Sequence, residues 1–191
     1  MTLIRTIGVA PGVICGIGVI DWDSNEPEVA SAHVLQCDSG LCLAVVASLI
    51  EEAPGHVGVA IEHYVSGLTQ DGGAAGLTRS LVEHLIRLAD ERADAWWSWP
   101  AHQVRSWATD ERMHAGGLAS LANGMALHGL DGLRHALYAA VRDGGLRDPL
   151  SRRGFRKPPP PGTPPVPSVR AGRLTHRFAL SHPHIEQTTG V

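Results

Sequence analysis

Glu62 is the first residue whose type and position suggest chemistry. It follows the short apolar run 57–61, which is typical of a buried strand. A charge on such a strand is costly to bury unless something pairs with it. In open α/β sheets, ligands and catalytic groups gather at the carboxyl ends of the strands. Glu62 is therefore a candidate catalytic group or metal ligand, and the alternative is a glutamate that emerges at the strand end into solvent.

A second group consists of His128, Asp131 and His135, which are spaced by three and four residues. On a continuous helix these side chains share one face. A His-x-x-Asp pair aimed at a glutamate on a neighbouring strand offers the hard ligands that Mg²⁺ or Mn²⁺ prefers. A helix N-cap at Asp131 and an ordinary polar face explain the same residues equally well.

These residues must be positioned by a series of strands and helices. Three consecutive strands with no helix between them predict an antiparallel meander at the start of the chain. The whole order, β-β-β-α-β-α-β-α-α, predicts an α/β fold: a mixed five-stranded sheet with helices on both faces. We expect strands at 3–10, 16–22, 28–37, 57–64 and 95–99, helices at 41–52, 74–92, 100–107 and 130–141, a Gly-rich loop at 67–76 and a weakly patterned connector at 109–127.

The 191 residues suffice for one domain and an appendage. Residues 1–146 carry a net charge of −9, whereas residues 147–191 carry +6, and eight of the thirteen prolines cluster at 149–167. We therefore predict a domain over 1–146 and a largely disordered, basic, Pro-rich tail over 147–191, whose removal after Gly145 leaves the fold intact. The tail suits a nucleic-acid partner, and a solvated spacer or a docking segment for an SH3-like partner are the alternatives.

Several protein classes are disfavoured by the sequence. No apolar run is long enough to span a membrane, and the apolar first twenty residues are broken by Arg5, Gly8 and Pro11, unlike a secretory signal. The three cysteines are an odd number without C-x-x-C spacing, so we expect neither a disulfide framework nor a zinc site. A cytosolic location fits these features.

Four motifs, in order, resemble those of the RuvC-like Holliday-junction resolvases of the RNase H-like superfamily, and especially the short RuvC-like proteins of actinobacterial phages. The first motif is a strand-turn-strand and the second an acidic strand. The third follows the last strand, and the fourth lies on the last helix. They read Gly8-Val-Ala-Pro-Gly12 with Gly16-Ile-Gly-Val-Ile20, Val59-Ala-Ile-Glu62, Trp99-Pro-Ala-His-Gln-Val-Arg105 and His128-Gly-Leu-Asp131.

This resemblance implies a homodimeric endonuclease that resolves Holliday junctions or other branched DNA by two-metal phosphodiester hydrolysis with Mg²⁺, or with Mn²⁺. It makes Glu62, His128 and Asp131 metal ligands, with His135 as the alternative. The resemblance also implies that the helix at 74–92 forms the dimer interface, although its leucines could instead face the sheet.

Ala10 falls where the resembled family has its first catalytic aspartate. In the family this side chain bridges the two metal ions, and a methyl group cannot replace it. We therefore expect the chain as written to be inactive. An engineered substitution and a natural, non-catalytic branched-DNA-binding protein both explain Ala10. Asp21 and Asp23 are not substitutes, because both lie at the far end of the second strand.

The DNA contacts expected from the sequence fall into two sets. In the domain, Tyr64 would stack on an unpaired base or pack at the rim, while Arg105 and Arg112 would lie near the scissile phosphate. Trp96, Trp97, Trp99 and Trp107 are expected to be packing residues. In the tail, the basic side chains would contact phosphates, and they are Arg152, Arg153, Arg156, Lys157, Arg170, Arg173 and Arg177.

Overall fold

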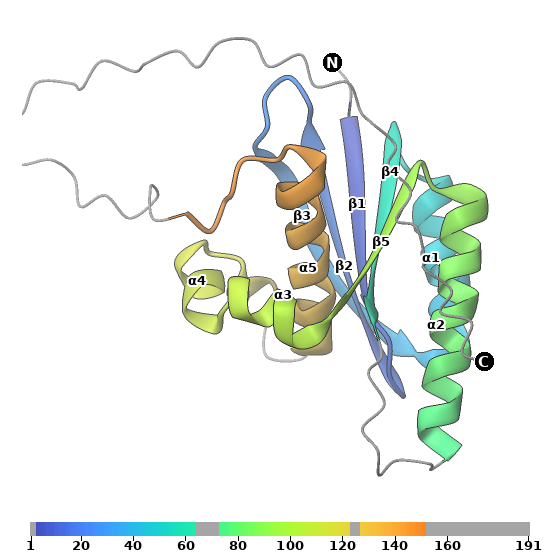
Figure 1. The fold of residues 1–191 in the computed structure, drawn as a ribbon. Helices are drawn as coiled ribbons and strands as arrows, with labels where there is room; N and C mark the ends of the chain where they lie inside the picture. The colour runs from blue at the N-terminus through green and yellow to red at the C-terminus, as the bar shows by residue number, and fades with distance from the viewer. Residues whose placement is uncertain (1–2, 64–72, 123–126, 152–191) are drawn as a thin grey trace, which may run out of the picture. The chain divides into compact units, whose positions relative to one another are not determined.

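The computed structural model describes residues 3–63, 73–122 and 127–151, which all belong to one compact unit, Met1–Arg156 (Figure 1). The chain begins with three antiparallel strands, β1 (Leu3–Ala10), β2 (Ile14–Asp23) and β3 (Val29–Asp38). This confirms the meander predicted from the sequence. No helix in the described ranges is both long enough and apolar enough to cross a membrane.

Two parallel strands complete the sheet. β4 (His56–His63) pairs with β1, and β5 (Ala95–Pro100) pairs with β4, so the strand order is β3-β2-β1-β4-β5. Parallel neighbours need crossover connections, which α1 (Ser39–Glu51) and α2 (Gly73–Arg92) supply. The predicted mixed five-stranded sheet with helices on both faces is confirmed.

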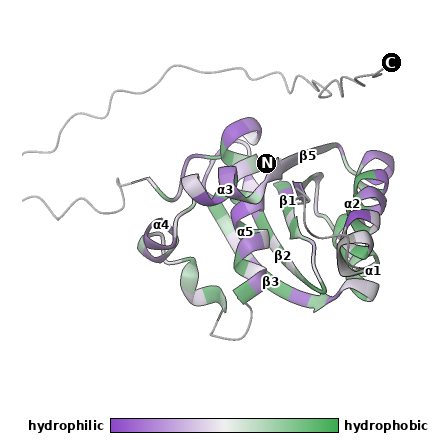
Figure 2. Cartoon of the chain, turned by 60° about the horizontal axis from the view of Figure 1, so that its bottom comes forward, coloured by the Kyte–Doolittle hydropathy of each residue, from purple (hydrophilic) through white to green (hydrophobic). Residues whose placement is uncertain are grey.

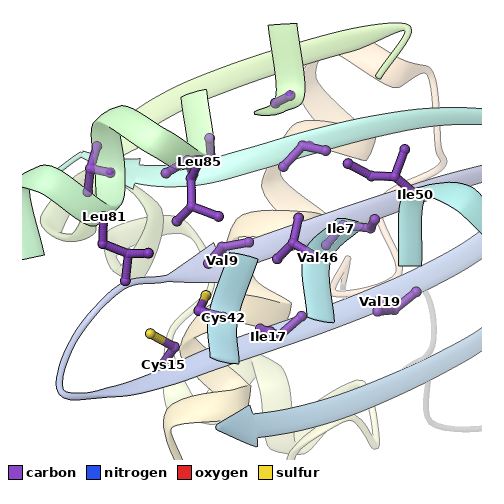
Figure 3. Packing of buried hydrophobic residues seen from close by; sticks show 14 of the residues in the cluster. Ile7, Val9, Cys15, Ile17, Val19, Cys42, Val46, Ile50, Leu81 and Leu85 are labelled. Atoms are coloured by element: carbon purple, nitrogen blue, oxygen red, sulfur yellow. The ribbon is translucent and has the colours of Figure 1, made fainter. Parts of the chain in front are cut away.

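One face of the sheet packs against α1 and α2 (Figure 3). Alternate residues of the central strands point to this face, as period-two alternation requires. Among the leucines of α2, Leu81 and Leu85 are buried against the sheet, whereas Leu77 is 72% exposed. The core on this face includes Ile7, Val9, Ile17, Val59, Ile61, Cys42, Val46 and Leu85.

The opposite face packs against α3 (Ala101–Trp107), α4 (Asp110–Ala115) and α5 (Leu127–Ala139), which continues into a π-helical turn, η2 (Ala140–Gly144). Figure 2 shows these helices on one side of the sheet and α1 and α2 on the other. The second core lies here and includes Ile20, Trp22, Met113, Leu133, Ala136 and Leu137.

The helix α4 and the short 3₁₀ helix η1 (Ala119–Ala122) correct the prediction of a weakly patterned connector over 109–127. Thr109 caps α4 by accepting a hydrogen bond from the backbone N–H of Arg112 at 3.3 Å, and the first turn is acidic. Met113 is fully buried. A helix of six residues is too short to show apolar periodicity. Its N-cap, Thr109, is the feature from which the sequence could have predicted it.

The backbone of α5 lies directly on the backbones of β1 and β2. A Cβ at Gly132 would lie 2.7 Å from the backbone oxygen of Gly16 and 2.7 Å from the backbone nitrogen of Gly18. A Cβ at Gly8 would lie 2.0 Å from the carbonyl oxygen of Gly132. We call these four residues, Gly8, Gly16, Gly18 and Gly132, the glycine seam. Because the seam leaves no space for side chains, it fixes the height of α5 above the sheet.

The packed chain continues beyond Leu146. Leu146 and Leu150 are both buried in the second core, and Asp148 forms an ion pair with Arg112 at 2.8 Å. These residues include the first part of the segment 147–191, which the sequence assigned to the tail. The sequence did not predict this packing, because Leu146 and Leu150 are isolated leucines with no periodic pattern around them, and Leu150 lies in the proline-rich stretch.

Candidate functional site

Ala10 and Glu62 lie side by side at the carboxyl ends of β1 and β4. The parallel register pairs Val9 with Ile61, so the next residue of each strand occupies the neighbouring position. Val9 and Ile61 both point into the core under α1 and α2. By alternation, Ala10 and Glu62 point to the face covered by α5.

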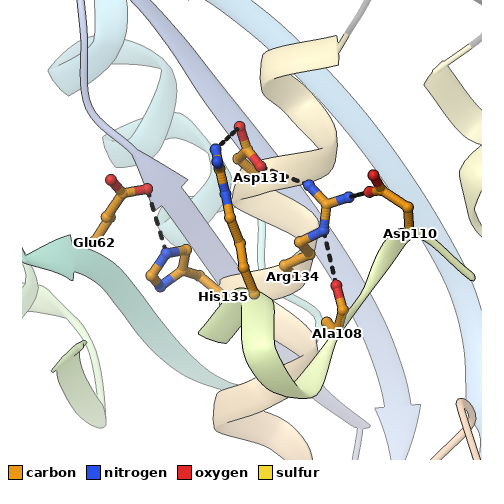
Figure 4. Close-up of polar contacts among 7 residues, drawn as sticks. Glu62, Ala108, Asp110, Asp131, Arg134 and His135 are labelled. Carbon is orange, nitrogen blue, oxygen red and sulfur yellow. Dashed lines mark hydrogen bonds and ion pairs between the residues drawn. The ribbon is translucent and has the colours of Figure 1, made fainter. Parts of the chain in front are cut away.

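Glu62 is paired with His135 of α5. The distance from His135 Nε2 to Glu62 Oε2 is 3.4 Å, and the two side chains are 2% and 23% exposed, respectively (Figure 4). The other ring nitrogen of His135, Nδ1, is buried and has no hydrogen-bond partner. The predicted alternative ligand thus lies beside the predicted catalytic carboxylate.

Asp131 is held by two guanidinium groups instead. Its Oδ1 accepts a hydrogen bond of 2.6 Å from Arg134, and its Oδ2 accepts one of 2.8 Å from Arg105 (Figure 4). Arg134 also donates to the carbonyl oxygen of Ala108 at 3.0 Å and pairs with Asp110. Its side chain is 10% exposed, whereas that of Arg105 is 59% exposed. Both oxygens of Asp131 are therefore engaged by cations of this chain.

His128 is exposed in the first turn of α5, and its backbone lies against β2 at Gly16. The described part of the chain contains no group of three or more His, Cys, Asp or Glu residues that could hold a metal ion. A divalent ion does not fit the side chains as they stand, because position 10 offers only a methyl group and both Asp131 oxygens bind guanidiniums. The metal-ligand role of Glu62, His128 and Asp131 stays a prediction.

A groove beside Asp131 opens between α3, α4 and α5. Its volume is about 590 Å³, and its lining includes Arg105, Asp110, His114, Asp131 and Arg134. The exposed guanidinium of Arg105 is the group in this lining that can turn toward a phosphate at small cost, because surface ion pairs contribute little.

Arg112 occupies a structural position. It pairs with Asp148, donates to the carbonyl oxygens of Leu150, at 3.4 Å, and of Trp107, and lies over the Trp107 ring at 5.0 Å. These contacts tie α4 to the last packed residues. The other predicted DNA contacts, Tyr64 and the tail residues Arg152, Arg153, Arg156, Lys157, Arg170, Arg173 and Arg177, lie outside the described residues.

Trp97 and Trp99 of β5, Trp107 of α3 and Tyr138 of α5 form one aromatic cluster, whereas Trp96 packs against the core on the other face. Trp97 and Trp99 stack with ring centroids 6.2 Å apart, and Trp99 and Trp107 meet the Tyr138 ring edge-on at 5.1 and 5.5 Å. The Tyr138 hydroxyl accepts a hydrogen bond of 2.8 Å from Gln103. All of these rings are half-buried, in agreement with the packing role expected for them.

Asp21 lies at the other end of the sheet from Ala10. Arg5 donates two hydrogen bonds to the Asp21 carboxylate, at 2.8 and 3.1 Å, across the β1–β2 pair. This hydrogen bonding raises the pKa of Arg5. Asp21 is therefore engaged in the sheet, away from Ala10, as expected from its place on the second strand.

Sequence reasoning missed Arg134 and Asp110. Arg134 follows Asp131 by three residues, a spacing at which helical side chains of opposite charge pair. The Asp131–Arg134 ion pair could therefore have been predicted from the sequence. Asp110 comes from α4, which the sequence did not predict. The pairing of Arg134 with Asp110 depends on tertiary packing.

Comparison with known proteins supplies structural similarity only. No protein-family model matches the chain, and a search of curated proteins finds no match. Among solved structures, the chain is similar to T. thermophilus RuvC in complex with a Holliday junction substrate, with 18% identity over 72% of this chain and 96% of that chain and a TM-score of 0.47. It is also similar to a Thermus thermophilus RuvC structure, with 19% identity, the same coverages and a TM-score of 0.45.

Proposed function

We propose that the chain binds branched DNA through the domain described above and does not cut that DNA as written. The observation that carries this proposal is the edge formed by β1, β4 and α5. The strand register sets Ala10 beside Glu62, and α5 carries both His135, which contacts Glu62, and Asp131, which is paired with Arg134. This arrangement supports a DNA-binding edge that does not carry out metal-dependent cleavage.

The DNA would be held by exposed basic groups. Arg105 projects at the groove beside Asp131 with 59% of its side chain exposed. The tail supplies a net positive charge that attracts phosphates without regard to sequence. As a homodimer, the chain would present two such edges to the arms of one junction.

A binding assay tests this proposal. A four-way junction and a linear duplex of the same sequence are titrated with the full chain, once with EDTA and once with Mg²⁺. We expect tighter binding of the junction, equal affinities in the two buffers and no nicked product. Arg105→Gln should weaken binding of both DNAs, and Arg87→Gln, on the exposed side of α2, is the matched charge control. Equal affinity for junction and duplex would contradict the proposal.

A second candidate function is a metal-dependent endonuclease that resolves branched DNA once an aspartate stands at position 10. The register that places Ala10 beside Glu62 favours it, because a carboxylate there would lie next to another carboxylate. The test compares Ala10→Asp with the uncharged, near-isosteric Ala10→Asn in nicking of four-way junctions with Mg²⁺ or Mn²⁺. Cleavage by the aspartate variant alone supports this candidate, and absence of cleavage by a folded, junction-binding Ala10→Asp protein removes it.

A further inference from the structure

Arg134 is a buried cation at the centre of the site. Its side chain is 10% exposed, and a guanidinium stays charged at every pH at which the protein is folded. A buried charge is tolerated only where partners compensate it. Asp131, Asp110 and the carbonyl oxygen of Ala108 surround the guanidinium on three sides. Arg134 therefore has fixed partners in the folded domain.

The next residue along α5 engages the other carboxylate. His135 is 2% exposed and directs Nε2 at Glu62 Oε2. Consecutive residues of one helix thus contact the two acidic side chains that the sequence singled out, Glu62 through His135 and Asp131 through Arg134 (Figure 4).

We propose that Arg134 takes the place of a divalent cation at Asp131 while His135 occupies the contact position on Glu62, so that both carboxylates are held by the protein alone and the site binds no Mg²⁺ or Mn²⁺. The methyl group of Ala10 is compatible with this arrangement, because a third carboxylate at that position would have no cation to bind. This inference concerns metal binding and stands whether or not the chain binds DNA, but it is incompatible with the second candidate function, in which Ala10→Asp alone restores metal binding.

The two arginines on Asp131 differ in how easily they can move. Arg105 is 59% exposed and can turn into solvent. Arg134 is buried and is also bound to Ala108 and Asp110, so leaving Asp131 would break these contacts, and the glycine seam holds α5 against β1 and β2. A divalent ion on Asp131 would lie beside this immobile positive charge and would be repelled by it. Arg134, and not Arg105, is therefore the residue that excludes the ion.

Metal binding to the full chain tests the proposal in two ways. The loss of the electron paramagnetic resonance signal of free Mn²⁺ counts bound ions, and the thermal unfolding midpoint is compared in EDTA and in excess Mn²⁺. We expect no bound Mn²⁺ and no shift for the chain as written or for Ala10→Asp. For Ala10→Asp with Arg134→Met, we expect a rise of roughly 5 to 10 °C when free Mn²⁺ exceeds its Kd a hundredfold. The matched control, Ala10→Asp with Arg105→Gln, should show no rise.

Three results would overturn the proposal. One is stoichiometric Mn²⁺ binding by the chain as written that Asp131→Asn abolishes. Another is a rise for Ala10→Asp alone that equals the rise of the Arg134 double variant. The third is a folded Arg134 double variant that binds no Mn²⁺. If the double variant does not fold, the Mn²⁺ titrations of the chain as written and of Ala10→Asp decide the matter.

Discussion

Asp131 shows at the scale of a single residue how its surroundings decide what a carboxylate can do. The sequence made Asp131 a candidate metal ligand, but its oxygens accept hydrogen bonds from Arg134 and Arg105. The Asp131 side chain is 17% exposed, and of its two guanidinium partners Arg134 is buried whereas Arg105 is exposed. Its role in this chain is therefore to compensate Arg134.

Asp131→Asn should destabilise the domain, because Arg134 would keep only the exposed Asp110 as an ionic partner. We expect a loss of about 1.5 to 3 kcal/mol, the range for hydrogen bonds to charged groups. Arg105→Gln removes the exposed partner of the same carboxylate and should cost less than about 1 kcal/mol. Urea unfolding of both variants measures the difference, and equal losses would show that burial of Arg134 does not matter.

At the scale of elements, the site depends on the contact between α5 and the sheet. The glycine seam brings the backbones together without intervening side chains, so the positions of Asp131 and His135 follow from backbone contact. Substitutions at exposed positions of α5, such as His128, can be absorbed by side-chain rotation. Substitutions in the seam cannot, because the atoms they meet belong to the backbone.

Gly132→Ala should therefore be severely destabilising. Its Cβ would lie 2.7 to 2.8 Å from backbone atoms of Gly16, Gly18 and Gly8. We expect a loss of about 3 kcal/mol or more, the upper part of the range for overpacking. The control is Gly76→Ala in α2, where a Cβ meets nothing within 4 Å and the better helix former should add up to about 1 kcal/mol. Chemical denaturation checks both, and a neutral Gly132→Ala would mean that α5 can move away from the sheet.

The elements also show what can and cannot be predicted from the sequence. Strands β1, β2 and β4 were predictable because their β-branched runs end at Pro or Gly or at a polar residue, and strand ends located Glu62 correctly. The helix α4 was not, since six residues contain no periodicity. The close approach of the α5 backbone to β1 at Gly8 and Gly132 could not be predicted either. A glycine in a strand or helix pattern does not indicate which other element will pack against it.

At the scale of the whole molecule, the domain extends past the last helix. Leu146 and Leu150 are buried, and Asp148 pairs with Arg112. These contacts fasten the chain across α4 and η2 before the tail begins. The length of chain that is needed for stability is therefore set by two leucines.

Truncation after Ser151 should leave the stability of the domain unchanged, whereas truncation after Gly145 should lower it. The shorter protein loses two buried leucine side chains, each worth about 1.5 to 3 kcal/mol. Urea unfolding midpoints of the two truncated proteins and of the full chain make the comparison. If the protein ending at Gly145 is equally stable, the domain ends near residue 146, as the composition predicts, and the two leucines do not contribute to its stability.

The tail should supply much of the salt-dependent affinity for DNA. Seven basic residues and one acidic residue lie in 152–191. Each phosphate that they neutralise should contribute about 0.9 to the slope of log affinity against log salt on duplex arms. The protein ending at Ser151 should therefore show a flatter slope and keep its preference for the four-way junction. An unchanged slope would leave the tail without a role in DNA binding, and a lost preference would move junction recognition into the tail.

The glycine seam also determines when the domain can fold during synthesis. It joins Gly8, in the first strand, to Gly132, which the ribosome adds only after most of the domain has been made. Synthesis proceeds at about 5 to 20 residues per second, so the α5 face of β1 and β2, including Ile20 and Trp22, stays uncovered for many seconds. Contacts between residues so distant in sequence also form slowly. The nascent N-terminal strands are therefore the surface that a chaperone would bind, and the sheet reaches its final form only when α5 arrives.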